Sequence, residues 1–119
     1  MNKYTNIDEY ISNFPQEVQV TLEKIRSIAK THLPSGVEAI RYGIPTIQVK
    51  GKNIVHFGGY PHHVAIYPAS DGMIEAIPEL GIYRTGKGTL QFKLSEAMPF
   101  KLMSNAIRYL SAVSGKDNN

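Results

Sequence analysis

Hydrophobic residues recur at helical spacing in two long segments of the chain. The first segment carries them on one helix face, at Val18, Leu22, Ile25, Ala29 and Leu33, and 34–36 (Pro-Ser-Gly) ends the pattern. The second begins at 99 and carries them at Leu102, Met103, Ala106, Ile107, Leu110 and Val113. This spacing predicts two amphipathic helices, one near each end of the chain.

Two shorter helices are expected from capping residues. Thr5 precedes residues 7–13 and Asp8 stands three positions after it, which is a capping-box pattern. Pro15 fits the first turn of the long helix that follows, where its missing N–H is tolerated. Asp71 is the expected cap of a helix over 73–77.

The middle of the chain alternates in the manner of strands. Segments 46–49 and 54–57 flank residues 50–53, in which Gly51 can take the positive φ of a tight hairpin. Further strands are expected at 62–67 and 89–94. The resulting order is ααβββαβα, an α+β fold with a small antiparallel sheet and flanking helices. Residues 1–113 form one predicted domain, and 114–119 a disordered tail.

The amino-acid composition indicates one domain and excludes several kinds of functional site. The chain has 119 residues, 42% hydrophobic and 19% charged, which suits one domain with its own core. It contains no cysteine, so thiolate metal sites, disulfides and cysteine nucleophiles are excluded. The net charge of +3 is mild. The first ten residues lack an apolar run and no segment reaches membrane-spanning length, so we expect a cytoplasmic protein without a membrane association.

Three histidines lie close together in the predicted sheet. A turn at Gly51-Lys52 places His56 on the face of Ile47, Val49 and Ile54. An even-length connection to the next strand then sets His63 opposite His56, and an odd one sets His62 there. Either pair could hold a divalent metal, so His56, His62 and His63 are the candidate metal ligands. The alternative is one half-buried, hydrogen-bonded histidine and another on a loop.

A carboxylate, a guanidinium and a phenol stand together in residues 38–45 (EAIRYGIP). Gly43 and Pro45 bend the chain there, so Glu38, Arg41 and Tyr42 could converge on a cleft at a sheet end. Lys87, in the glycine-rich run RTGKGT, and Tyr67 are assigned to the same ligand site. The alternatives are a Glu38–Arg41 pair with a packed Tyr42, and a plain glycine-rich turn at Lys87.

The same stretch resembles the E-x-I-x-Y-G-x-P signature of the YdhG-like small bacterial domains of unknown function. The resemblance continues through the hairpin at 50–53, the HVAIYP run at 63–68 and GKGTLQF at 86–92, and covers about residues 5–112. It implies a compact α+β fold. One branch of that family is described as a frataxin-like iron chaperone that supplies iron to iron–sulfur cluster or haem assembly.

The resemblance therefore implies a non-enzymatic, weakly iron-binding chaperone, with iron–sulfur or haem-synthesis proteins as partners. The alternative is a module that binds a small anionic ligand or a protein partner at the cleft. Nucleic acid ranks last, because no clustered aromatic residues are evident to stack bases. No nucleophile elbow, HExxH or paired-carboxylate motif occurs, which disfavours an enzyme.

Overall fold

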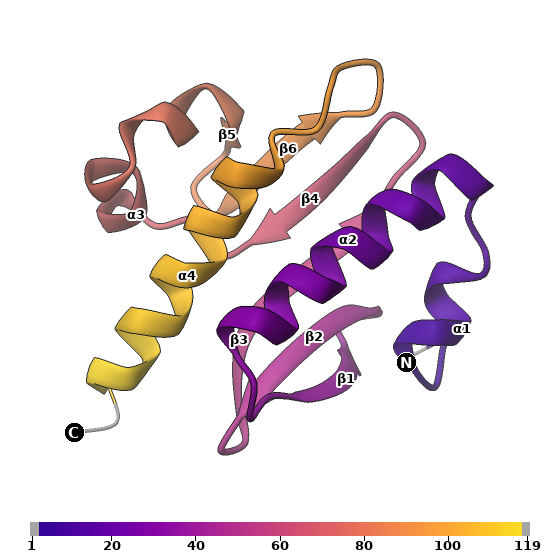
Figure 1. The fold of residues 1–119 in the computed structure, drawn as a ribbon, viewed down its shortest axis with the longest axis horizontal. Coiled ribbons are helices and arrows are strands. Elements are labelled where there is room, and N and C mark those ends of the chain that lie inside the picture. Colours follow the sequence, from indigo (N-terminus) through magenta and orange to yellow (C-terminus); the bar gives the residue numbers. More distant parts are fainter. Residues whose placement is uncertain (1–2, 118–119) are drawn as a thin grey trace.

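In a computed structural model that describes residues 3–117, a six-stranded antiparallel sheet lies behind two long helices (Figure 1). The helices are α1 (Ile7–Ile11), α2 (Gln16–His32), α3 (Asp71–Ala76) and α4 (Phe100–Asp117), with a 3-10 helix η1 (Pro78–Tyr83). The strands are β1 (Val37–Arg41), β2 (Ile44–Val49), β3 (Lys52–Gly59), β4 (His63–Tyr67), β5 (Arg84–Thr85) and β6 (Thr89–Lys93). Their order in the sheet is β1-β2-β3-β4-β6-β5. The predicted α+β class with an antiparallel sheet is confirmed.

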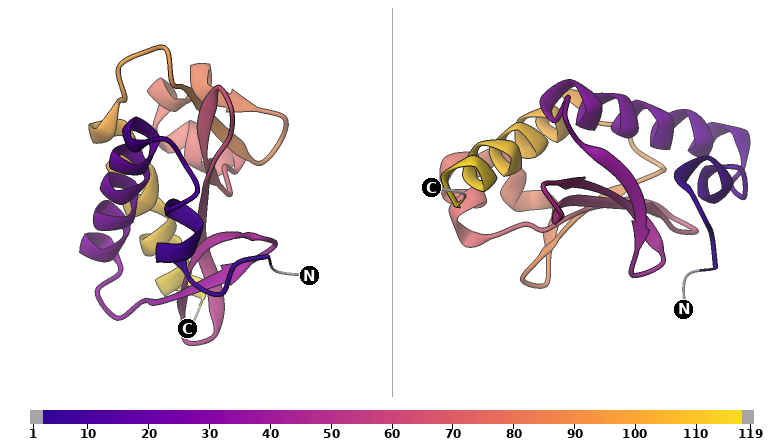
Figure 2. Two further views of the ribbon diagram at one scale, coloured as in Figure 1. Left: turned by 90° about the vertical axis from the view of Figure 1, so that its right-hand side faces the viewer. Right: turned by 90° about the horizontal axis from the view of Figure 1, so that it is seen from below.

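The two amphipathic helices form as their stripes predict, and both pack on one side of the sheet (Figure 2). Leu22, Ile25 and Ala29 of α2 are fully buried, as are Met103 and Ile107 of α4. Together with the apolar residues that the strands direct toward them, they form one continuous hydrophobic core. Burial of these stripes is the main stabilising contribution to the fold.

The residue that caps each short helix lies one position away from the expected cap. Asn6, not Thr5, caps α1, because its Oδ1 accepts the Glu9 N–H at 2.8 Å while the Thr5 hydroxyl donates to the Glu9 carboxylate. Ser70, not Asp71, caps α3 by accepting the Met73 N–H. Both replacements are themselves favoured capping residues.

The strand β1 was not expected from the sequence. It pairs with β2 through a two-residue turn in which Tyr42 (φ 56°) and Gly43 (φ 78°) both adopt positive φ, the geometry of a type I′ hairpin. Pro45 argues against a strand in the sequence, since it cannot donate to a ladder. It is tolerated here as the second residue of β2.

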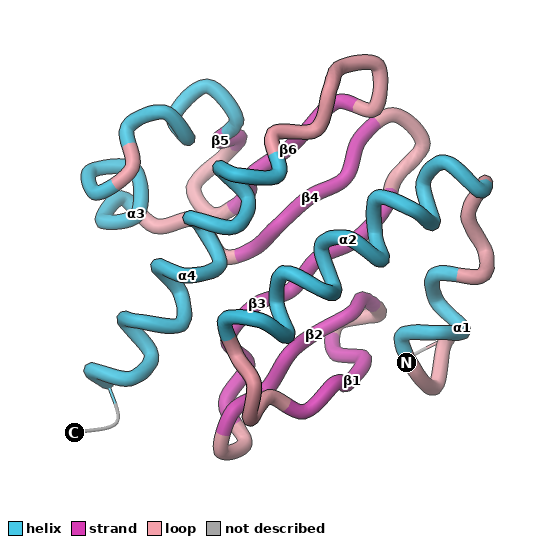
Figure 3. The backbone as a smooth tube through the Cα atoms, viewed as in Figure 1, coloured by secondary structure: helices cyan, strands magenta, loops and turns pink. Residues whose placement is uncertain are grey.

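The strand β3 is longer than predicted, and its register is irregular. It continues through Gly58 and Gly59, where a break was expected, and its pairing with β2 shifts between Ile47 and Gln48. The tight turn lies at Lys50-Gly51, one position before the turn assumed from the sequence. Figure 3 shows α2 and α4 in front of the strands, and α3 in the connection that leads from β4 to β5.

The last helix, α4, continues to Asp117, beyond the position at which a tail was expected to begin. The remainder of that predicted tail, 118–119, lies outside the described residues. No helix within residues 3–117 is long and apolar enough to cross a membrane.

Candidate functional site

The sheet face turned away from α2 and α4, here called the open face, is defined by the strand register. Thr46 lies opposite His56, and His56 opposite Tyr67, so these three side chains share one face of β2, β3 and β4. Val55 and Phe57, on either side of His56, are fully buried on the helix side. His56 and Tyr67 therefore point away from the core.

Five ring-bearing residues form a continuous row across the open face: Tyr42, His56, Tyr67, Tyr60 and His63. We call this set the aromatic row. The rings of Tyr42 and His56 meet edge to face at 5.7 Å, and His56 is paired with Tyr67 across the sheet. The hydroxyls of Tyr67 and Tyr60 lie 3.0 Å apart. The Tyr60 ring stacks on His63 at 4.8 Å and 15°.

Small residues lie beneath this row. Gly58 and Ala65 are paired across β3 and β4, and both are buried. A Cβ atom on Gly58 would come within 3.3 Å of the Tyr60 hydroxyl. Because these positions lack bulk, Tyr60 and Tyr67 can reach toward one another over the sheet surface.

His56 is held in one orientation by Thr46. The Thr46 hydroxyl donates to the Ile44 carbonyl at 3.1 Å and lies 2.7 Å from His56 Nδ1. Since a hydroxyl carries one hydrogen, Nδ1 is the donor to Thr46, and Nε2 carries the lone pair of a neutral ring. Burial lowers the pKa of His56 below its usual range, which favours this neutral form.

Burial also shifts the pKa of Tyr67 and of His63 in the other half of the row. Burial raises the pKa of Tyr67 well above its usual value, and the hydrogen-bonded Tyr60 hydroxyl raises it further. Burial, followed by the neighbouring His62, lowers the pKa of His63. These shifts favour the neutral forms of His56, Tyr67 and His63, whose ring edges can form hydrogen bonds.

Tyr10 of α1 forms hydrogen bonds to the end of β3, beneath the row. The Tyr10 hydroxyl accepts the Gly59 N–H at 3.1 Å and lies 3.4 Å from the Gly59 carbonyl. On the other side of Gly59, a Cβ atom would come within 2.8 Å of the Phe14 ring. Glycine is required here by close packing, and this fixes the connection that carries Tyr60.

Two cations flank the aromatic row. Ile40 is buried on the helix side of β1, so its neighbour Arg41 lies on the open face. Lys93 of β6 lies opposite His63 on the same face. Both side chains are exposed. The row thus runs between a guanidinium on one edge strand and an ammonium on β6.

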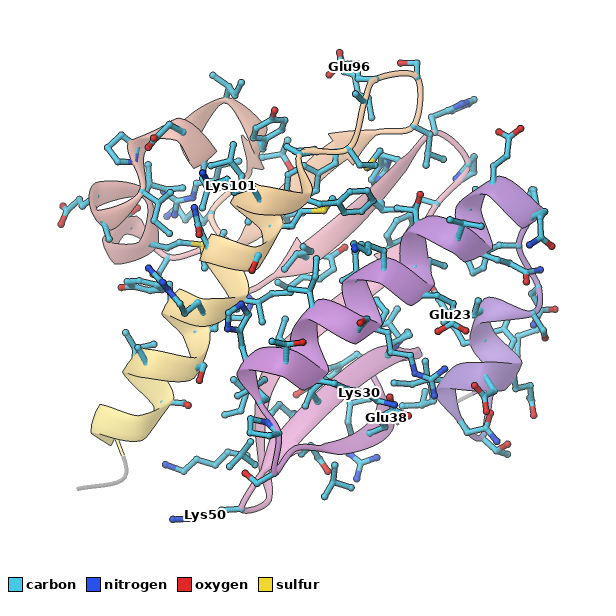
Figure 4. The ribbon with its side chains drawn as sticks, viewed as in Figure 1. Glu23, Lys30, Glu38, Lys50, Glu96 and Lys101 are labelled. Atoms are coloured by element: carbon cyan, nitrogen blue, oxygen red, sulfur yellow. The ribbon has the colours of Figure 1, made fainter. Side chains whose placement is uncertain are left out.

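The described strands carry one carboxylate, Glu38, and it lies on the helix side. It accepts two hydrogen bonds from Arg26 of α2, at 2.7 and 2.6 Å, and lies 3.5 Å from Lys30 (Figure 4). Arg26 also binds Asp8 and Glu23. These ion pairs join α1, α2 and β1 on the helix side of the sheet, so the charged side chains that β1 and β6 direct to the open face, Arg41 and Lys93, are positive.

The ligand site expected from the sequence is assembled only in part. Glu38 faces the helices, whereas Arg41 and Tyr42 lie at the open face, so neither the cleft nor the alternative Glu38–Arg41 pair forms. Tyr42 is 84% exposed instead of packed. Lys87 lies in the tight β5–β6 turn at the opposite edge of the sheet from β1, which matches the plain-turn alternative. Tyr67, the fifth residue of the expected site, lies on the open face with Arg41 and Tyr42.

The histidines are not brought together as a metal pair. Both predicted registers are wrong, because β3 continues through Gly58-Gly59 and places Tyr67 opposite His56. His63 begins β4 four residues earlier, roughly 13 Å along the strand. His56 is half-buried and hydrogen-bonded while His62 is exposed in the connection, as the alternative interpretation predicted. Among residues 3–117, no three histidine, aspartate or glutamate side chains gather as a metal site.

One premise of the sequence interpretation is therefore wrong. Clustered aromatic residues were thought absent, but strand pairing gathers residues that are up to 25 positions apart, from Tyr42 to Tyr67, into one row. The alternation His56, Gly58 on one strand and Ala65, Tyr67 on the next was the available signal. It could be used only once their register was known.

Comparison with known proteins finds no matching family model and no matching curated protein. Among solved structures, the fold is similar to the crystal structure of YdhG, a DUF1801-family protein from Bacillus subtilis, with a TM-score of 0.77. The match covers 92% of this chain and 90% of that one at 15% sequence identity. At this identity the likeness concerns the fold alone. The chain therefore has the fold of a YdhG-like domain.

Proposed function

We propose that this chain is a non-enzymatic binding module that takes a small anionic ligand with a planar ring on its open face. The observation that carries the proposal is the aromatic row itself, which lies between Arg41 and Lys93 on a face without a strand carboxylate. Rings bind planar groups by stacking, and the flanking cations attract the negative charge.

The exposed tyrosine at one end of the row favours this function. Tyr42 is 84% exposed although it occupies a positive-φ turn position that a small residue would fill more easily. Its ring gains one edge contact from His56 and otherwise faces solvent. A large aromatic group held in this manner is available to stack on a ligand.

The polar edges of the row supply hydrogen bonds for recognition. Nε2 of His56 can accept a hydrogen bond from a ligand, because Nδ1 is already hydrogen-bonded to Thr46. The paired hydroxyls of Tyr60 and Tyr67 share one hydrogen bond, which leaves a second hydroxyl hydrogen for a ligand acceptor. The row thus offers an acceptor and a donor close to its stacking surfaces.

Isothermal titration of the full chain with thymidine monophosphate, thymidine and inorganic phosphate tests this function. Thymidine monophosphate combines a planar ring with an anion, so we expect it to bind more tightly than either fragment. Absence of saturable binding at millimolar thymidine monophosphate would contradict the proposal.

A pair of equally exposed residues supplies the control. Tyr42→Ala removes a stacking ring, and we expect a loss of about 1 kcal/mol in binding free energy, or about fivefold in affinity. Ile82→Ala, at a position 85% exposed in η1 and outside the open face, should leave the affinity unchanged. Equal effects from both variants would exclude the open face as the site.

The iron-chaperone role implied by the resemblance, with its iron–sulfur or haem partners, stays a separate prediction. Ferrous iron is bound in proteins by imidazole nitrogens together with carboxylate oxygens. The carboxylates that gather in this structure are Asp8, Glu23 and Glu38, and Arg26 binds all three. Anaerobic titration with ferrous iron tests this role: submillimolar binding would support it, and its absence would remove it.

A further inference from the structure

We propose that the anionic ligand is a short single-stranded oligonucleotide that crosses the open face from Arg41 to Lys93. This inference rests on the proposed function and specifies its ligand. Arg41 and Lys93 lie far apart on the sheet. Their strands are separated by four intervals in the order β1-β2-β3-β4-β6, which corresponds to about 19 Å.

Both cations lie at the same end of the sheet. Arg41 is paired with Ile44 beside the β1–β2 turn, and Lys93 with His63 at the start of β4. A mononucleotide has one phosphate and one base, so it cannot engage both cations and the rings between them. A chain with several phosphates and several bases can do so.

The side chains between the cations suit unpaired bases. Single-stranded nucleic acids bind to sheet faces on which aromatic side chains stack two or three bases, with cations along the backbone path. Tyr42, Tyr60 and His63 present rings near the end of the sheet where Arg41 and Lys93 lie. In a duplex, the faces of the bases are already stacked on one another, so these rings would have no partner.

A hollow next to Lys93 extends the surface past the last strand contacts. It has a volume of about 290 Å³ and is lined by Pro61, His62, His63, Gln91, Lys93, Leu94 and Ser95. Its amide, imidazole and hydroxyl groups can hydrogen-bond a base edge or a sugar. The path from Tyr42 through His63 therefore continues into this recess, whose largely apolar lining carries a few polar groups, instead of ending at a flat edge.

The charges around the face agree with this ligand. The described strands place no carboxylate on the open face, because Glu38 is bound by Arg26 on the helix side and the carboxylates of α1, α2 and α3 belong to helices. Glu96 follows β6 in a turn and is the one acidic residue within three positions of Lys93. Its removal should therefore strengthen binding.

Fluorescence anisotropy with 5′-labelled hexathymidylate tests the inference on the full chain, with unlabelled thymidine monophosphate as competitor. Because every further stacked base adds to the affinity, we expect the hexamer to bind at least about fivefold more tightly than the monophosphate. A blunt DNA duplex long enough to stay paired should bind more weakly than the single strand.

Two phosphate contacts predict a shallow salt dependence. The logarithm of the binding constant should fall with the logarithm of salt concentration with a slope of about −1.4, that is, about −0.7 for each contact. Arg41→Gln and Lys93→Gln should each reduce this slope by about half. Lys101→Gln, on α4 and away from the open face, is the matched control and should leave it unchanged (Figure 4).

The outcomes separate the two proposals. If thymidine monophosphate binds as tightly as the hexamer, the oligonucleotide inference is overturned and the proposed function stands. If neither binds, both are overturned. If Lys101→Gln weakens hexamer binding as much as Arg41→Gln, the contact is general charge attraction and the inference is overturned. The same holds if sedimentation shows a dimer that Tyr42→Ala dissociates and the hexamer does not bind.

Discussion

The hydroxyl groups of Tyr60 and Tyr67 lie 3.0 Å apart, although Tyr60 follows β3 and Tyr67 ends β4, at opposite ends of that strand pair. The two side chains must extend along the sheet toward one another to meet, and Gly58 and Ala65 leave the space for them. This hydrogen bond connects the two halves of the aromatic row. The row is thus an arrangement of side chains, not a consequence of strand pairing alone.

A double-mutant cycle tests that connection. Tyr60→Phe and Tyr67→Phe each remove one partner of the half-buried bond, and we expect each to cost about 1 kcal/mol in unfolding free energy. Because both lose the same interaction, the double variant should cost less than the sum. Urea unfolding supplies the three values. Strict additivity would indicate that the hydroxyls do not interact.

Close packing around Gly59 should make it intolerant of a side chain. Gly59→Ala would place Cβ 2.8 Å from the Phe14 ring, and we expect a destabilisation of about 1–3 kcal/mol. Gly88→Ala is the control, since nothing lies within 4 Å of its Cβ position. In a Phe14→Leu background the cost of Gly59→Ala should shrink, as measured by thermal unfolding. An unchanged cost would contradict the packing explanation.

Loss of the Arg26 side chain should lower the free energy of unfolding more than loss of any one of its carboxylate partners. Its side chain is 14% exposed, and Arg26→Met would leave Glu38 partly buried without a counter-charge. Because solvent reaches part of the pair, we expect a loss of about 2 kcal/mol, below that of a fully buried pair. Asp8→Asn removes a partner that is 79% exposed and should cost much less than Arg26→Met. Comparable losses in urea unfolding would disprove this hierarchy.

Acid should destabilise the fold in two steps. Burial lowers the pKa of His56 from 6.5, so the unfolded chain takes up a proton first, and stability falls as the pH decreases below about 6.5. Arg26 lowers the pKa of Glu38 from 4.5, so a second loss follows below about pH 4.5. His56→Gln should reduce the first step, to which the lowered pKa of His63 also contributes, and retain the second. Unfolding curves at a series of pH values measure both, and an unaltered first step would contradict the assignment.

Much of the fold could be predicted from the sequence because its signals are local. The stripes of α2 and α4, the glycine of the β2–β3 hairpin and the alternation in β4 and β6 each depend on neighbouring residues. The strand β1 was missed because Pro45 and Gly43 suggested a bend, whereas Gly43 completes a two-residue hairpin with Tyr42.

The candidate site was harder to predict because it depends on register. A shift of one residue between β3 and β4 would move His56 away from Tyr67 and turn one of them toward the core. The glycines that continue β3 also resemble a break, which led to the wrong histidine pairs. Glu38 was misassigned because its partner, Arg26, lies 12 positions earlier on another element.

The central claim is that the open face is the binding surface. The most direct test is a two-dimensional ¹H–¹⁵N NMR titration of the labelled full chain with hexathymidylate. The account predicts chemical-shift changes concentrated at the amides of Arg41, Tyr42, Tyr60, His63 and Lys93, with α2 and α4 nearly unaffected. Changes centred on the two long helices, or no saturable changes at all, would contradict it.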